Sequence, residues 1–381
     1  MQSNIIIHST TSLQQISVKE SMNQKDRYSR QTIMPEIGSA GQERLSAAKV
    51  LVVGAGGLGC PVLQYLAGAG IGTIGIVDFD TVDVSNLQRQ TLYKTDDAGL
   101  LKATVAKERL LQLNPDIVVN AYPDELTEKN VVGLFSVYDI IVDGTDNFSA
   151  KFLINDTAVK TGKTVVYGAI QSFDGQVSVF DATRGPCYRC LHPQPPEGVV
   201  LNCAEAGVIG ALAGIVGTVQ AMEVIKLVVH DTSFRPLIGK LWRVDARTME
   251  TNIINIPKRQ NCPICSKAAA EIILQSSSPV CFSAMAQEVD CHDLEDAVLI
   301  DVRELSEWAA GHIEGALHLP LSVLQKKPST FTPPANSKRC ILYCQRGMRS
   351  KQAVEMLLNA GYQDISSLKG GYEAYQATLR D

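Results

Sequence analysis

Residues 49–59 read KVLVVGAGGLG, and this stretch decides the fold of the first part of the chain. Its first five residues predict a short buried strand, and the residues after the last glycine have helical spacing. Gly54, Gly56 and Gly59 match G-x-G-x-x-G, in which a turn without side chains brings a phosphate to a helix N-terminus. Asp78 lies 19 residues beyond Gly59, where a carboxylate can accept hydrogen bonds from ribose hydroxyls. The stretch therefore predicts a nucleotide site.

Strands and helices alternate after this stretch. Further strands are predicted at 73–77, 117–122, 139–142 and 164–168, with helices at 61–70 and 102–113. The alternation predicts an α/β fold, a Rossmann-like doubly wound sheet that is mostly parallel and covered by helices on both faces.

A second, smaller α/β domain is expected near the end of the chain, because the alternation resumes there. Its predicted elements are strands at 297–301 and 340–344 and a helix at 350–359. We expect a mobile tail at 1–23, a first domain at 24–266, a linker at 267–280 that includes a short helix at 267–274, and a second domain at 281–381.

The composition is typical of a packed globular protein. The chain has 381 residues, 45% of them hydrophobic, and a formal charge of −5, which argues against broad charge-driven binding of nucleic acid. No secretory signal precedes the first domain. The longest uncharged apolar run, residues 206–222, is shorter than the roughly 20 residues that a bilayer span needs, so we interpret it as a buried helix. We expect a cytoplasmic protein that binds neither nucleic acid nor membrane.

A dense polar segment follows the second predicted strand. Residues 78–90 read DFDTVDVSNLQRQ, and Lys102 opens a helix 13 residues after Arg89. When the α-phosphorus of a triphosphate is attacked, negative charge develops on the phosphates, and cations such as Arg89 and Lys102 stabilise it. A nicotinamide site needs few cations, because the backbone already binds its diphosphate. Residues 143–147, DGTDN, end another strand, and Asp146 is a candidate ligand of Mg²⁺. Taken singly, each residue fits a helix cap or a solvated charge equally well.

Four of the ten cysteines form two pairs with the spacing of zinc ligands. Two residues separate Cys187 from Cys190, and two separate Cys262 from Cys265. Four thiolates are the closed tetrahedral set of structural zinc, with no position left for a reacting water. We predict a zinc site that stabilises the fold. The alternative is four buried or reactive thiols.

Together these segments resemble the MoeB/ThiF class of ubiquitin-activating-like adenylyltransferases over residues 24–266. The matching motifs are the glycine loop, RYSRQ at 27–31, SNLQRQ at 85–90, DGTDN at 143–147, CYRC at 187–190, CAEAGV at 203–208 and CPIC at 262–265. Within the class, the match is closest to molybdopterin-synthase adenylyltransferases. The resemblance implies that Mg-ATP is used to adenylate the C-terminal glycine of a small ubiquitin-like sulfur carrier, with release of pyrophosphate.

The resemblance also implies roles for single residues. Gly57 and Asp78 hold the nucleotide, while Arg89 and Lys102 neutralise its phosphates. Asp146 positions Mg²⁺ with Asn147 beside it, and the phosphate site is lined by Ser85, Asn86, Leu87, Gln88 and Arg89. Arg30 matches an arginine that reaches into the ATP site of a partner copy, so a homodimer is implied.

Cys344 opens a second candidate site. Cys344 is the first residue of CQRGMR at 344–349, which lies between a predicted strand and a predicted helix. Backbone N–H groups, the helix N-terminus, Arg346 and Arg349 favour a thiolate at this position. Cysteine phosphatases are the alternative, but they have five residues between Cys and Arg where this loop has four. In the rhodanese family, which this region resembles, the shorter loop goes with sulfur chemistry.

The region around Cys344 resembles the rhodanese sulfurtransferases across residues 282–381. LIDVRE at 299–304 and GHIEGA at 311–316 complete the match. The resemblance makes Cys344 the persulfide carrier and makes Asp301 and Arg303 a structural pair.

The two resemblances together predict adenylation followed by sulfur transfer. The Cys344 persulfide attacks the carrier acyl-adenylate, directly or through Cys203, and reductive cleavage leaves a carrier thiocarboxylate. Cys203 matches a carrier-linked thiol in several relatives and is dispensable in the simplest ones. The expected partners are a MoaD-like carrier ending in Gly-Gly, with a ThiS-like carrier as the other candidate, and a persulfide donor such as a cysteine desulfurase.

Two other classes of function stay open at this point. An NAD-dependent oxidoreductase explains the glycine loop but not SNLQRQ, Lys102 or the cysteine pairs. A non-catalytic scaffold with a degenerate nucleotide site is the other class, although the expected polar residues are all present.

Overall fold

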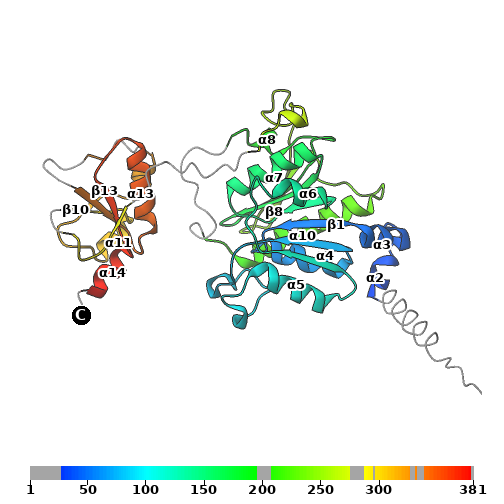
Figure 1. Cartoon of the computed structure of the whole chain (residues 1–381), viewed down its shortest axis with the longest axis horizontal. Helices are drawn as coiled ribbons and strands as arrows, with labels where there is room; N and C mark the ends of the chain where they lie inside the picture. The colour runs from blue at the N-terminus through cyan, green and yellow to red at the C-terminus, as the bar shows by residue number, and fades with distance from the viewer. Residues whose placement is uncertain are drawn as a thin grey trace, which may run out of the picture. The chain divides into compact units, whose positions relative to one another are not determined.

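The computed structural model describes residues 27–194, 207–274, 287–294, 297–326, 331–332 and 339–378. The described residues up to 274 form one compact unit, and those from 287 form a second (Figure 1).

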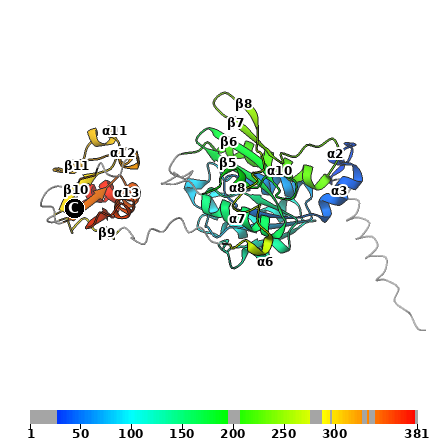
Figure 2. The same ribbon diagram turned by 90° about the horizontal axis from the view of Figure 1, so that it is seen from above.

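An eight-stranded sheet forms the centre of the first unit, in the order β3-β2-β1-β4-β5-β6-β7-β8. The strands are β1 Lys49–Val53, β2 Thr73–Val77, β3 Val118–Tyr122, β4 Ile140–Asp143, β5 Thr164–Gln171, β6 Asp174–Phe180, β7 Lys240–Asp245 and β8 Glu250–Asn255. Neighbours from β3 to β5 are parallel, and neighbours from β5 to β8 are antiparallel. Figure 2 shows the antiparallel strands side by side. The parallel half confirms the predicted doubly wound sheet. The antiparallel strands β6, β7 and β8 make the sheet mixed.

Helices cover both faces of the parallel half. The helices and short 3₁₀ turns of this unit are α2 Ser29–Thr32, α3 Gly38–Ala47, α4 Gly59–Ala69, η1 Val84–Asn86, η2 Thr95–Asp97, α5 Lys102–Leu113, α6 Val131–Ser136, α7 Phe148–Thr161, α8 Tyr188–Leu191, α10 Gly210–Val229 and η3 Ala269–Glu271. Val50 and Val52 of β1 belong to the core shared with α4, α5 and α10. Leu51 and Val53 belong to the opposite core, shared with α6 and α7 (Figure 1). Alternate residues of one strand therefore hold two helical layers together.

The apolar run at 206–222 falls on α10, which extends to Val229. By length and composition alone α10 could cross a membrane. Here it packs against α4, β5 and β6, and a Cβ on Gly217 would lie 2.5 Å from Leu58 O. Small residues allow this close approach, and the prediction of a buried helix is confirmed.

A five-stranded parallel sheet forms the second unit, in the order β11-β10-β12-β13-β9. Its elements are β9 Gln287–Val289, β10 Ala297–Asp301, α11 Leu305–Ala309, β11 Leu317–His318, α12 Leu321–Lys326, β12 Arg339–Tyr343, α13 Met348–Asn359, β13 Ile365–Leu368 and α14 Gly371–Thr378. Leu342 packs in the core with Val354 of α13, while Ile341 and Tyr343 lie in the core on the other face. This is the smaller α/β unit that the sequence predicts.

The prediction of a short helix at 267–274 is wrong. Only the three residues of η3 are helical there. The ammonium of Lys160 on α7 donates hydrogen bonds to the carbonyls of Ala269 and Ile272, at 3.1 and 2.7 Å. These tertiary bonds hold the segment in a single turn against α7, overriding the helix propensity of its alanines.

Candidate functional site

The glycine loop folds tightly between β1 and α4. Gly54 has a φ of +89°, and its N–H donates to the carbonyl of Val77 at 2.8 Å, which ties the loop to the end of β2. A Cβ on Gly59 would lie 1.9 Å from the carbonyl oxygen of Gly54, so a side chain does not fit there. Main chain is thereby exposed at the carboxyl end of the sheet, where α/β proteins bind ligands.

Asp78 lies beside this loop at the end of β2. Its carboxylate accepts hydrogen bonds from the N–H of Ala55 at 2.7 Å and from the N–H of Asp80 at 2.9 Å. Burial raises the pKa of Asp78, and the charge of Lys102 opposes that rise. A carboxylate that the loop itself holds in place is suited to accept hydrogen bonds from ribose hydroxyls.

Two cations approach the loop from the polar segment and from α5. Lys102 is 4% exposed, and its ammonium donates to the carboxylate of Asp80 at 2.9 Å. The Cγ of Arg89 would lie 3.4 Å from a Cβ placed on Gly57, so the arginine stem covers the loop. Its guanidinium makes one long bond, 3.4 Å to the carbonyl of Ser85. Both cations therefore lie at the glycine loop, where they could bind the phosphates of a nucleotide.

The loop after β4 meets the glycine loop from the other side. A Cβ on Gly54 would lie 2.9 Å from the carbonyl oxygen of Gly144. Below it, the buried carboxylate of Asp143 accepts from the ammonium of Lys151 at 3.1 Å, and Lys151 also donates to the carbonyl of Gly168 at 2.9 Å. This buried pair fixes the end of β4, and the sequence analysis did not single out Lys151.

Asp146 and Asn147, which end that loop, have different surroundings. The carboxylate of Asp146 is exposed and has no hydrogen-bond or ion-pair partner among the described residues, so it is free to bind a cation. Asn147 caps α7, because its side-chain oxygen accepts from the N–H of Ala150 at 2.8 Å. The cap that we kept as an alternative therefore applies to Asn147.

The remaining residues of SNLQRQ lie on and after η1. Ser85 bonds to Asp83, the carbonyl of Gln88 packs against Gly210 at the start of α10, and Leu87 packs against the core. The amide of Asn86 donates to Ser85 Oγ at 3.1 Å and its oxygen accepts from Gln90 at 3.1 Å. Gln90 is 4% exposed, and its side-chain oxygen has no partner in the part of the chain that the structure describes.

Arg30 does not join the nucleotide loop of its own chain. The hydroxyl of Tyr28, two residues earlier, accepts from Asn114 at the end of α5 at 2.8 Å and packs on Gly70, just after α4. The glycine loop lies at the opposite end of α4, about 16 Å away at 1.5 Å per residue. Arg30 is exposed, with no partner among the described residues.

The four paired cysteines come together as one cluster. Their Sγ atoms all lie within 4.8 Å of one another, with Cys187 to Cys262 at 3.5 Å and Cys190 to Cys265 at 3.6 Å. These distances are too long for disulfide bonds, for which about 2.0 Å is needed. Burial raises the pKa of Cys187, and raises that of Cys265 to about 12, so a bound cation is needed to keep these two as thiolates at neutral pH. The donor set fits zinc.

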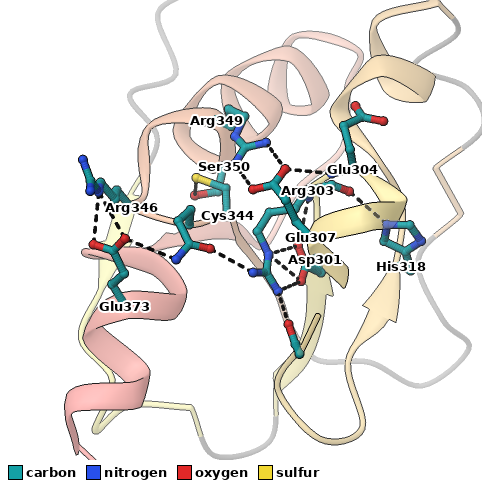
Figure 3. A network of polar contacts seen from close by, with 12 residues as sticks. Asp301, Arg303, Glu304, Glu307, His318, Cys344, Arg346, Arg349, Ser350 and Glu373 are labelled. Carbon is teal, nitrogen blue, oxygen red and sulfur yellow. Dashed lines mark hydrogen bonds and ion pairs between the residues drawn. The ribbon is translucent and has the colours of Figure 1, made fainter. Parts of the chain in front are cut away.

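Cys344 lies at the carboxyl end of β12, where the chain turns into α13. Its side chain is buried, and the hydroxyl of Ser350 lies 3.7 Å from Sγ. Figure 3 shows Cys344 between two ion pairs. Arg349 forms a two-bonded pair with Glu307 at 2.7 and 2.6 Å, and Arg346 binds Glu373 at 3.2 and 3.1 Å.

Comparison with known proteins gives matches over both units. The model of the ThiF family matches residues 28–264, and that of the rhodanese-like domain matches residues 284–378. The chain belongs to the ThiF family. It carries a rhodanese-like domain after the ThiF domain, which confirms both resemblances seen in the sequence.

Curated relatives share this two-part organisation. The ThiF-family chain is 40% identical to the probable adenylyltransferase/sulfurtransferase MoeZ of Mycobacterium tuberculosis, covering 93% of each chain. It is 37% identical to the adenylyltransferase and sulfurtransferase uba4 of Ogataea parapolymorpha, covering 92% of this chain and 95% of the relative. The sulfur carrier protein adenylyltransferase of Thermus thermophilus is 50% identical and covers 63% of this chain and 90% of its own. The chain is thus an adenylyltransferase with a sulfurtransferase domain, and an NAD-dependent oxidoreductase is not favoured.

Solved structures support the fold of the ThiF domain. Escherichia coli MccB bound to ATP superposes with a TM-score of 0.55, at 23% identity, over 63% of this chain and 75% of that one. At this identity the likeness concerns the fold alone.

The structure adds carboxylate partners to the arginines predicted beside Cys344 in this ThiF-family protein. Arg346 and Arg349 are each paired with a carboxylate from another element, and the charge of Arg349 also acts on Cys344. Asp301 and Arg303 form the expected structural pair, with bonds of 2.7 to 3.0 Å. Cys203, the predicted accessory thiol, lies outside the described residues.

Proposed function

We propose that this protein adenylates the C-terminal glycine of a ubiquitin-like sulfur carrier and then converts it to a thiocarboxylate. The observation that carries the proposal is that one chain holds both a cation-flanked glycine loop and a buried cysteine at the end of a parallel strand. The relatives that combine the two domains are named adenylyltransferase and sulfurtransferase, and one covering a single domain is named for a sulfur carrier protein. A MoaD-like carrier is our first candidate, since a relative in Porphyra purpurea is named a probable molybdopterin-synthase adenylyltransferase.

In the first step a carboxylate oxygen of the carrier's terminal glycine attacks the α-phosphorus of ATP. The bond to the β-phosphate oxygen breaks, and pyrophosphate leaves with the electron pair. Asp78 accepts from the ribose, while Arg89 and Lys102 stabilise the charge that develops on the phosphates. Asp146 would hold Mg²⁺, which supplies further charge neutralisation when bound. The orphaned acceptor of Gln90 and the partnerless Asp146 fit such a polar ligand.

In the second step the terminal sulfur of a Cys344 persulfide attacks the acyl carbon, and AMP leaves. The product is an acyl disulfide between the carrier and Cys344. A thiol then attacks Cys344 Sγ, forms a disulfide with it and releases the carrier thiocarboxylate, so that the thiols supply the two electrons. Cys203 and an external thiol are the candidates for this role.

Several parts of the proposal concern partners. A persulfide donor such as a cysteine desulfurase would load Cys344. A homodimer would bring Arg30 of one copy to the glycine loop of the other, because Arg30 lies near the end of α4 that is far from its own loop.

Structural zinc would hold Cys187, Cys190, Cys262 and Cys265 together. We place the protein in the cytoplasm.

The first test is exchange of labelled pyrophosphate into ATP by the purified protein, with and without a carrier ending in Gly-Gly. We expect exchange only with the carrier, because its carboxylate is the nucleophile. Exchange with every carboxylate tested, or with none of the candidate carriers, would contradict the proposal. Absence of exchange would favour the scaffold alternative.

A further inference from the structure

The N-terminus of α14 lies directly against the Cys344 loop. The N–H of Tyr372 donates to the carbonyl of Cys344 at 2.8 Å, and the N–H of Glu373 donates to the carbonyl of Gln345 at 3.1 Å. A Cβ on Gly371 would lie 2.3 Å from the carbonyl oxygen of Cys344, so a side chain there would displace the loop. The free N–H groups of the last helix thus fix two loop carbonyls, which keeps those carbonyls from turning toward the sulfur.

Glu373 adds side-chain contacts to the same loop. Its carboxylate accepts from the amide of Gln345 at 3.2 Å and from Nε of Arg346 at 3.2 and 3.1 Å. These hydrogen bonds lower the pKa of Glu373, so the carboxylate is ionised at neutral pH. Gln345 in turn accepts from Arg303 at 2.9 Å (Figure 3), which joins the loop to the end of β10.

The charges around Cys344 are balanced pair by pair. On the side of α11 and α13, Arg349 is bound by Glu307. On the side of α14, Arg346 is bound by Glu373, and below the loop Arg303 is bound by Asp301. The pair of Arg346 and Glu373 differs from the other two in its exposure, since the Arg346 side chain is 78% exposed. It is therefore the pair whose arginine can move when its carboxylate is lost.

We propose that Glu373 is a positioning residue for sulfur transfer: it holds the Cys344 loop against α14 and keeps the charge of Arg346 away from the sulfur. This rests on the sulfur-transfer step proposed above. A persulfide paired with a free arginine is a more stable anion and a weaker nucleophile, because nucleophilicity falls as the basicity of the sulfur falls. The charge of Arg349, which Glu307 holds, already acts on Cys344. With Arg346 held by Glu373, the sulfur anion gains no second arginine and attacks more readily.

The test compares three variants of the full chain: Glu373→Gln, Arg346→Gln and their double variant. Glu314→Gln, which removes an exposed carboxylate from the same unit, is the matched control. The first readout is the rate of Cys344 alkylation by iodoacetamide against pH, followed by mass spectrometry of the peptide that contains it. The second is sulfur transfer from thiosulfate to cyanide, in which sulfite leaves as Cys344 takes the sulfane sulfur and cyanide then removes it as thiocyanate.

Opposite shifts are expected. Glu373→Gln frees Arg346 and moves the alkylation midpoint to lower pH by about half a unit or more, whereas Arg346→Gln leaves Glu373 unpaired and moves it to higher pH. The double variant returns to within about 0.2 units of the parent. Sulfur transfer falls at least about fivefold in kcat for Glu373→Gln, with less change in KM. The control and the exchange of pyrophosphate stay unchanged.

The inference is overturned if both single variants keep the alkylation profile of the parent, or if both shift it in the same direction, as a purely structural collapse of the loop would do. Arg346→Gln changes a solvent-exposed side chain, so it keeps the test decisive if Glu373→Gln does not fold. If the parent itself transfers no sulfur, the proposed function fails, while the alkylation profiles still decide the role of Glu373.

Discussion

Lys102 is a charged residue in a place that normally excludes charge. Its side chain is 5% exposed, and its ion-pair partner Asp80 is 54% exposed, while the charge of Lys102 also acts on the half-buried carboxylate of Asp78. Burial of an ammonium is costly even with such carboxylates nearby, and a bound phosphate would offset part of that cost. The geometry is that of a cation held ready for a phosphate.

We predict that Lys102→Ala lowers carrier-dependent pyrophosphate exchange at least about 100-fold, roughly 3 kcal/mol of transition-state stabilisation. Folding is expected to persist, because Asp80 remains solvated when its partner is removed. Lys129→Ala, which removes an exposed lysine, is the control. Exchange within threefold of the parent in Lys102→Ala would contradict the role of this residue.

At this scale the sequence placed several candidate residues at one edge of the sheet, but it did not predict their contacts. Asp78, Arg89 and Lys102 lie at the glycine loop that contains Gly57, since the carboxyl ends of parallel strands meet at one edge. Their roles in catalysis stay predictions. The partners of Arg346 and Arg349 were not predictable, because Glu373 and Glu307 lie 27 and 42 residues away in the sequence. Such pairs depend on the packing of α11 and α14 in three dimensions.

At the scale of elements, the parallel strands of the first unit were predicted. Its antiparallel strands β6, β7 and β8 were not found, nor were the parallel strands β9, β11 and β13 of the second unit. β1, β2 and β4 are buried on both faces and read as continuous apolar runs, which is the pattern of parallel strands under helices. β8 is exposed at every position, so it offers neither an apolar run nor alternation of burial. The domain boundary at 267–280 stays a prediction, since the residues after 274 lie outside the described part.

The cysteine cluster joins two elements that are far apart in the sequence. Cys187 and Cys190 flank the start of α8, and Cys262 and Cys265 lie in a turn 75 residues later. We predict one zinc per chain, and we predict that Cys262→Ser loses the metal and lowers the melting temperature of the first unit by about 10 °C. Metal analysis and calorimetry measure both effects. Cys291→Ser in the second unit is the control, and full zinc content in Cys262→Ser would contradict the assignment.

Asp181 holds the turn after β6. Burial opposes its ionisation, but hydrogen bonds from Thr183, Thr164 and Arg184 lower the pKa of Asp181 to about 2. A folded pKa below the unfolded value stabilises the fold above pH 4, and the stabilisation is lost as the pH falls toward 2. We predict that Asp181→Asn destabilises the first unit by about 1 to 2 kcal/mol at pH 7 and by roughly half as much at pH 3.

Urea unfolding of the full chain at the two pH values measures this difference. Asp124→Asn, which changes an exposed carboxylate of the same unit, is the control. A destabilisation in Asp181→Asn that does not shrink between pH 7 and pH 3 would show that the side chain acts through packing instead of charge.

At the scale of the whole molecule, the chain divides into two compact units. Each has its own sheet, mixed in the first unit and parallel in the second, with a buried core on both faces of that sheet. Mutations in separate cores with no shared partners act independently. The relative from Thermus thermophilus, which matches 63% of this chain, supports the same division, because its length corresponds to the first unit alone.

We therefore predict that Cys344→Ala separates the two half-reactions. Carrier-dependent pyrophosphate exchange is expected within twofold of the parent, because Cys344 belongs to the core of the second unit and the glycine loop belongs to the first. Thiocarboxylate formation from a persulfide donor is expected to fall at least about 100-fold, because Cys344 is the thiol that we propose to carry the sulfur, and alanine cannot form a persulfide. Mass spectrometry of the carrier measures the product as a gain of sulfur in place of oxygen.

Lys102→Ala is expected to give the converse pattern. Cys344 is still loaded as a persulfide, but no acyl-adenylate is formed to receive the sulfur. If Cys344→Ala formed thiocarboxylate at the parent rate, sulfur would reach the acyl-adenylate without this unit, and the coupling of the two domains would need another explanation.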